Sequence, residues 1–263
     1  MSEANIPVVI FCGGEGTRMR SGTLTKKELV EIGGRPMIWH VMRIFSSYSF
    51  NNFVLPLGYE AQQIKQYFLN YEAMSRDFTV RVGLRENEIA YHGEASHPEW
   101  EVSLVDTGLR TNKASRVARV ADYLTGDRFF LTYGDGLCDI NIHELLAFHL
   151  NHGRLATLTA VQPTHYQYGI VEANESGLVS SFEQYPSLPY WINGGFMLFE
   201  KDALSYMRNG QEVPLETGAM QKMIADGQVM MYRHSGFWRS MDTIKDALDL
   251  ERIWQDGAPW KVW

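Results

Sequence analysis

The chain has 263 residues and is 45% hydrophobic, so it can bury one full core, and its net charge of −7 argues against a reader of nucleic-acid backbones. Its two cysteines, Cys12 and Cys138, lie far apart and form no Cys-x-x-Cys pair, which excludes a disulfide framework and disfavours a zinc site. No signal peptide and no long apolar span is evident, which predicts a cytoplasmic protein without a membrane partner.

Strand-like and helix-like patterns alternate along the chain. In the first part, strands are predicted at residues 7–12, 53–57, 78–82, 101–105, 129–133 and 156–161. Helices are predicted between them at 37–47, 60–71, 114–124 and 142–151. The second part is richer in strands, at 169–173, 179–184, 193–199 and 228–234, and ends in a helix at 243–255.

This alternation predicts an α/β fold, in which a mostly parallel sheet carries helices on both faces. Ligands of such sheets bind at the carboxyl ends of the strands, so we expect the loops after residues 12 and 133 to face one site. No low-complexity linker or internal repeat interrupts the chain. We therefore expect residues 1–263 to form a single domain.

The loop after the first strand is suited to an anion. Gly13, Gly14 and Gly16 allow a sharp turn that points several backbone N–H groups at one ligand. Arg18 and Lys27 add two cationic side chains nearby. The loop is neither the G-x-G-x-x-G dinucleotide motif nor a P-loop, and an ordinary strand-to-turn connection is the alternative. A polyphosphate is the ligand that this loop favours.

Longer motifs resemble the sugar-phosphate nucleotidyltransferase family. GGEGTR at 13–18, the lysine at 27 and VEIGGRP at 30–36 carry the resemblance first. VDTG at 105–108, TYGDG at 132–136, INGGF at 192–196, GFW at 236–238, MDT at 241–243 and APWK at 258–261 follow in family order. The VDTG, GFW, MDT and APWK segments favour the branch that uses CTP.

The resemblance implies a Rossmann-like nucleotidyltransferase fold of the GT-A type. Residues 1–140 would mainly bind the nucleotide, and residues 141–263 would form a smaller, strand-rich part that binds the acceptor. The implied reaction transfers CMP from CTP to a small phosphate-bearing acceptor, first of all glucose 1-phosphate, giving CDP-glucose and pyrophosphate. The implied cofactor is Mg²⁺.

The resemblance also assigns the charged site residues. Asp135 and Asp242 would hold the metal, and Asp139 is a weaker candidate; a turn aspartate and a helix N-cap are the alternatives for the first two. Arg18 and Lys27 would be catalytic, contacting the triphosphate and the transition state. Solvated surface charges are the alternative for both.

Two further sets complete the predicted site. The nucleotide set comprises Cys12, Gly13, Gly14, Gly16, Thr17, Thr107, Gly108 and Arg116. Arg116 would donate to the cytosine O2 or would be an exposed helix arginine. The acceptor set comprises Tyr133, Glu183, Tyr185, Asn193 and Gly194, for which an ordinary β-turn and a surface acid are the alternatives.

Three segments depart from the family pattern. They are Lys26-Lys27-Glu28, Lys113-Ala114-Ser115, and Gln184-Tyr185-Pro186, where the family has glutamate–lysine–proline. Glu28 would add negative charge where phosphates pass, and Lys26 could offset the lost acceptor lysine. A polyol phosphate, a modified sugar phosphate or a phosphonate is therefore an alternative acceptor.

Other classes and assemblies are left open. A non-catalytic module that binds CTP or a CDP-sugar is a second class, and a metal-dependent glycosyltransferase is a third, although its usual Asp-x-Asp pair is absent after Asp135. The insert at 78–100 and the terminal Trp254, Trp260 and Trp263 indicate docking or self-association.

Overall fold

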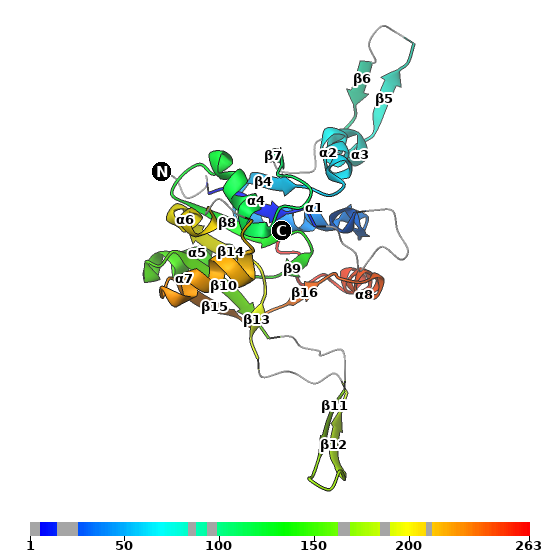
Figure 1. Ribbon diagram of the computed structural model, residues 1–263. Helices are drawn as coiled ribbons and strands as arrows, with labels where there is room; N and C mark the ends of the chain where they lie inside the picture. Colours follow the sequence, from blue (N-terminus) through cyan, green and yellow to red (C-terminus); the bar gives the residue numbers. More distant parts are fainter. Residues whose placement is uncertain are drawn as a thin grey trace.

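The computed structural model describes residues 6–14, 26–83, 88–93, 99–162, 169–184, 190–208 and 212–263. Within these ranges, one eight-stranded sheet has the order β13-β10-β14-β8-β1-β4-β7, and β15 pairs with β10 (Figure 1). Its strands are β1 Val8–Phe11, β4 Asn52–Leu57, β7 Glu101–Asp106, β8 Arg128–Tyr133, β10 Ala156–Val161, β13 Ile192–Asn193, β14 Met197–Glu200 and β15 Val229–His234.

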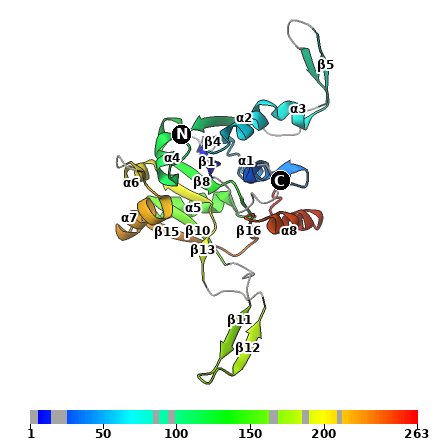
Figure 2. The ribbon, with the colours of Figure 1, turned by 45° about the vertical axis from the view of Figure 1, so that its right-hand side comes forward.

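Helices cover both faces of this sheet (Figures 1 and 2). Val8 and Ile10 of β1 face a core that includes side chains of α1 Met37–Ser46, α2 Ala61–Leu69, α5 Ile142–His152 and α8 Ile244–Gln255. Val9 and Phe11 face a second core with α4 Lys113–Arg119, α6 Leu204–Met207 and α7 Met220–Ala225. Because β1 is buried on both sides, every one of its residues is apolar.

The strands β8, β1, β4 and β7 run parallel, which confirms the predicted sheet. The second part of the chain adds β14 antiparallel to β8, then β10 and β13, so this side of the sheet is mixed. Register places Phe11 beside Tyr133 and Leu57 beside Asp106. The loops that follow these four strand ends therefore start from one edge of the sheet.

Several predicted elements are divided in the structure. The helix expected at 60–71 stops at Leu69, and α3 Tyr71–Ser75 follows it. The helix expected at 114–124 is α4 followed by a 3-10 turn, Ala121–Tyr123. The strand expected at 193–199 becomes β13 and β14, because Gly195 and Phe196 adopt φ values of 74° and 48°, which extended backbone does not allow.

Two hairpins project from opposite ends of the body (Figure 1). One pairs β5 Phe78–Arg81 with β6 Glu88–Tyr91, a strand that the sequence analysis missed. The other pairs β11 Ile170–Ala173 with β12 Val179–Glu183. Both leave apolar side chains exposed to solvent.

The aromatic tail packs on its own chain. Trp260 is fully buried, and its indole donates to Nδ1 of His40 on α1 at 3.4 Å. Trp254 and Trp263 pack at the edge of the same core. Among the helices described, none has the length and apolar character needed to cross a membrane.

Candidate active site

Three charged side chains from distant parts of the chain meet beside the carboxyl edge of the sheet. The ammonium of Lys27 donates to Asp135 Oδ2 and to Asp242 Oδ1, each at 2.7 Å. The two carboxylate oxygens therefore lie no farther apart than twice the 2.7 Å contact distance. The Lys27 side chain is 13% exposed, whereas those of Asp135 and Asp242 are 33% and 42% exposed. The cation is thus enclosed, and both carboxylates still face solvent in part.

Short elements hold this group in place. Lys27 begins a 3-10 turn, Lys27–Leu29, that leads through the small hairpin of β2 Glu31–Ile32 and β3 Arg35–Pro36 into α1. Asp135 follows β8, and its carbonyl accepts from the backbone N–H of Met241 at 2.8 Å. The strands β9 Gly136–Cys138 and β16 Trp238–Ser240 pair antiparallel and continue this link. The backbones that carry the two aspartates are therefore fastened side by side.

The N-cap alternative for Asp242 is wrong. Thr243 caps α8, because its hydroxyl accepts from the N–H of Asp246 while the Asp246 carboxylate accepts from the N–H of Thr243. This capping box leaves the carboxylate of Asp242 directed at Lys27 and Ser240. The carboxylate of Asp135 accepts a hydrogen bond from Lys27, which is 108 residues away in the sequence.

The electrostatics of the group keep Lys27 charged. Burial alone would lower the pKa of its ammonium, but the carboxylates of Asp135 and Asp242 outweigh burial and raise the pKa above its ordinary value. A protein cation therefore lies between two hard oxygen donors. This donor set is the kind that Mg²⁺ prefers, so the residues present fit such an ion.

Arg116 is buried, not an exposed helix arginine. Its terminal nitrogens donate to the carbonyls of Leu57, Gly108, Leu109 and Gly13 and to the hydroxyl of Thr107. A Cβ on Gly13 or on Gly58 would lie 2.6 Å from this guanidinium, so a side chain at either position would force Arg116 to shift. The guanidinium ties together the loops that follow β1, β4 and β7.

The predicted nucleotide residues lie around this arginine where the structure describes them. Thr107 donates its hydroxyl to Leu57 O at 2.7 Å, and the N–H of Gly108 donates to Asp106 Oδ1. The thiol of Cys12 is buried, which raises its pKa, so only its backbone could face a ligand. Gly14 is exposed. Gly16, Thr17 and Arg18 lie outside the described residues.

The two residues beside Lys27 correct the expectations made for them. Glu28 is turned inward, and burial raises the pKa of its carboxyl, so it places no exposed charge on a phosphate path. Its side chain would lie 2.8 Å from a Cβ at Gly134. Lys26 is also buried, and its ammonium donates to the carbonyls of Gly14 and Tyr59. Lys26 is therefore not available to replace a missing acceptor lysine.

A polar cluster lies on the acceptor side of the predicted site. Asn193 donates to the hydroxyl of Tyr133 at 3.1 Å, and that hydroxyl donates to Glu216 Oε1 at 2.9 Å. The ammonium of Lys113 pairs with Glu216 and lies 4.8 Å from the centre of the Tyr133 ring. Burial and the Glu216 carboxylate raise the pKa of Tyr133. Sequence reasoning missed Glu216, although a half-buried tyrosine at a strand end indicates that its hydroxyl needs a hydrogen-bond partner.

The remaining acceptor candidates fall in different places. Gly194 joins this region, since its carbonyl accepts from the indole of Trp238 at 2.8 Å. Glu183 does not join it, because it ends β12 on a projecting hairpin, where it is exposed (Figure 1). Tyr185 lies outside the described residues. Asp139 pairs with His234 at 2.8 Å at the far end of β9 from Asp135, so it is no substitute metal ligand there.

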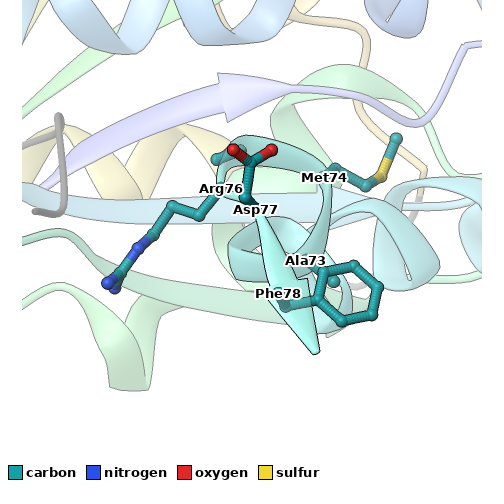
Figure 3. A pocket seen from close by; sticks show the side chains of 6 residues that line it. Ala73, Met74, Arg76, Asp77 and Phe78 are labelled. Atoms are coloured by element: carbon teal, nitrogen blue, oxygen red, sulfur yellow. The ribbon is translucent and has the colours of Figure 1, made fainter. Parts of the chain in front are cut away.

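A separate hollow of about 770 Å³ lies at the base of the β5–β6 hairpin. One short stretch, residues 73–78, lines it, and Figure 3 shows Arg76 extending to one side while Met74 and Phe78 lie to the other. The guanidinium of Arg76 is already bonded to Glu72 and to the carbonyls of His92 and Gly93. None of the residues that line the hollow belongs to the predicted site.

Comparison with known proteins shows the family to which the chain belongs. The profile of the nucleotidyl transferase family matches residues 7–256. A glucose-1-phosphate cytidylyltransferase of Salmonella typhi is 39% identical over 263 residues, covering 97% of this chain and 98% of the relative. A probable glucose-1-phosphate cytidylyltransferase of Bacillus subtilis (strain 168) is 36% identical over 257 residues, covering 97% of this chain and 99% of the relative.

Solved structures agree on the fold. The crystal structure of HddC from Yersinia pseudotuberculosis complexed with GMP-PN aligns with a TM-score of 0.66 at 15% identity, covering 95% of this chain and 99% of that chain. The family profile and both relatives span nearly the whole chain. The chain belongs to the nucleotidyl transferase family.

Proposed function

We propose that this protein transfers CMP from CTP to glucose 1-phosphate and releases CDP-glucose and pyrophosphate. The meeting of Lys27 with Asp135 and Asp242 carries the proposal, because a reaction between two polyanions needs fixed cations and metal-binding carboxylates at one point. The names of relatives that are 36% and 39% identical over nearly the whole chain support the choice of substrates.

In this reaction an oxygen of the acceptor phosphate forms a bond to the α-phosphorus of CTP. The bond from that phosphorus to the bridging oxygen breaks, and its electron pair leaves with pyrophosphate. The attacking oxygen is already an anion, so no general base is required. Lys27 would meet the charge that develops on the α-phosphate, and Arg18 would bind the triphosphate with its planar guanidinium.

We propose Mg²⁺ as the cofactor, held by the carboxylates of Asp135 and Asp242. Bound there, it would neutralise phosphate charge and help to orient the triphosphate. Arg116 and Thr107 would keep the base-side loops in shape, and the backbone at Gly13 and Gly14 would face the phosphates. Tyr133, Asn193 and Gly194 would border the sugar.

A pyrophosphate-release assay tests the proposal. The protein is incubated with Mg²⁺, each ribonucleoside triphosphate or dTTP, and a panel of phosphate esters. Release with CTP and glucose 1-phosphate supports it. Release only with a polyol phosphate, another sugar phosphate or a phosphonate would move the acceptor, and tight CTP binding without release would indicate a binding module.

Asp135→Asn is the matching variant, with Asp249→Asn as its control, because Asp249 is a partly exposed residue of α8 that pairs with Arg252. Asp135→Asn should lower the rate at least about a hundredfold, because several kcal/mol of charge stabilisation would be lost. Circular dichroism should show both variants folded. An unchanged rate for Asp135→Asn would remove this carboxylate from the metal pair.

We also propose that the chain self-associates through the β5–β6 hairpin. Register puts Phe78 beside Tyr91 and Val80 beside Ile89 on one face, and all four are at least 36% exposed. An isolated two-stranded sheet is only marginally stable in water, so a second copy would stabilise this apolar face. Light scattering after size exclusion should give an oligomer, and Val80→Lys should shift it to the monomer. A wild-type monomer would refute self-association.

A further inference from the structure

The ammonium of Lys27 occupies the position between two carboxylates that a divalent cation would also use. Its two contacts, at 2.7 Å each, are of the length expected for charge-assisted hydrogen bonds. The second oxygen of Asp242 accepts from Ser240 at 3.2 Å. Lys27 therefore offsets one of the two negative charges of the pair.

A divalent cation would compete with the Lys27 ammonium for these oxygens. Mg²⁺ binds oxygen ligands at about 2.0–2.1 Å in octahedral geometry, so an ion held by Asp135 Oδ2 and Asp242 Oδ1 would lie close to the ammonium that donates to the same atoms. Like charges at such short range also repel strongly, because this site is partly shielded from water. We therefore expect a divalent ion that binds Asp135 and Asp242 to displace Lys27 from at least one of its contacts.

We propose that Lys27 is an exchangeable internal counter-ion, which holds the carboxylate pair in the free protein and is released from it when a metal-bearing nucleotide arrives. The inference rests on the proposed function. The neighbouring Lys26 donates its ammonium to the carbonyl of Gly14 at 3.2 Å, so Lys27 lies near the glycine loop, and a triphosphate bound there would offer its ammonium new anionic partners. Lys27 would thus disfavour the free metal ion and favour the metal together with the nucleotide.

Thermodynamic linkage makes this proposal measurable. If the triphosphate draws Lys27 away from the carboxylates, the nucleotide must strengthen metal binding, and the metal must strengthen nucleotide binding by the same factor. Removing the ammonium should abolish most of this coupling. It should also leave two carboxylates without their counter-ion, so the free protein should bind a divalent cation more tightly.

The experiment measures Mn²⁺ binding by electron paramagnetic resonance, without and with CTP, on the full-length protein. Lys27→Met removes the ammonium, and Lys245→Met removes an exposed positive charge from α8, just after Asp242, as the control. Without CTP, Lys27→Met should bind Mn²⁺ at least about tenfold more tightly than the wild type, a difference of about 1.4 kcal/mol. Lys245→Met should match the wild type, and Asp242→Asn in the Lys27→Met background should lose the gain.

Two failures can be told apart. If Lys27→Met binds Mn²⁺ no more tightly than the wild type while the wild type still releases pyrophosphate from CTP, the exchange is refuted and the proposed function stands. If no variant binds Mn²⁺ even with CTP, the carboxylate pair is not a metal site, and both the exchange and the proposed cofactor are refuted. Circular dichroism on Lys27→Met separates either result from a loss of fold.

Discussion

Replacing Arg116 by lysine tests whether this side chain holds the nucleotide loops together. Among the described residues, its two terminal nitrogens donate to five acceptors on the loops after β1, β4 and β7, at 2.6 to 3.3 Å. A lysine ammonium has three donors, so at least two of these five hydrogen bonds would be lost, although Leu57 O would keep its bonds from Thr107. A hydrogen bond to a charged group contributes about 1.5–3 kcal/mol, so Arg116→Lys should lower the free energy of unfolding by about 3–6 kcal/mol.

Urea unfolding followed by circular dichroism measures this loss, and isothermal titration measures CTP affinity on the same samples. The control is Arg110→Lys, because Arg110 is exposed just before the same helix. We expect the control to stay within about 0.5 kcal/mol of the wild type, as surface substitutions usually do. Arg116→Lys with unchanged stability and weakened CTP binding would refute the loop-tying role and leave only a role in reading the base.

Three other substitutions probe the packing around the site. Gly33→Ala should destabilise the protein by about 1–3 kcal/mol more than Gly34→Ala in urea unfolding. Both positions have positive φ, but only a Cβ at Gly33 would meet Trp254, at 2.1 Å. Equal losses of stability in the two variants would exclude the clash. Burial lowers the pKa of His40 from 6.5 to about 4 in the folded protein. Between pH 6.5 and about 4 the unfolded chain therefore binds more protons at this residue than the folded protein does, so the protein loses stability as the pH falls through this range. This one group should make the protein about 2 kcal/mol less stable at pH 5 than at pH 7, and a difference undiminished in His40→Gln would assign the pH dependence to other groups. Trp260→Ala should cost about 3–5 kcal/mol, since the side chain is fully buried, and a melting temperature within error of the wild type would show that the tail is not part of the core.

The projecting hairpins and the divided helices and strands show what local sequence patterns cannot predict. The spacing of Ile64, Tyr67, Phe68 and Tyr71 correctly predicts a helical face, but it does not show that the helix breaks at Asn70. The strand Glu88–Tyr91 is short and polar at one end, so it has no strong period of its own and becomes a strand only by pairing with β5. Pairing partners are not visible in a local window of sequence.

The sequence by itself determined the alternation of strands and helices and the motifs that show the family of the chain. These features depend on side-chain periodicity and on motif spacing, which are properties of neighbouring residues. It also predicts that Lys27 is the catalytic lysine despite its altered neighbours, because VEIGG at 30–34 keeps the register of the family motif.

Only the tertiary structure decided what each charge faces. Lys27 reaches Asp135 and Asp242 across 108 and 215 residues of chain, and Arg116 reaches Gly13 across 103. Folding also buries the side chain of Glu28 and places Glu183 at the end of β12 on a projecting hairpin. The physical reason is that burial and ion pairing depend on which strand ends share an edge of the sheet, and that arrangement exists only once the chain has folded.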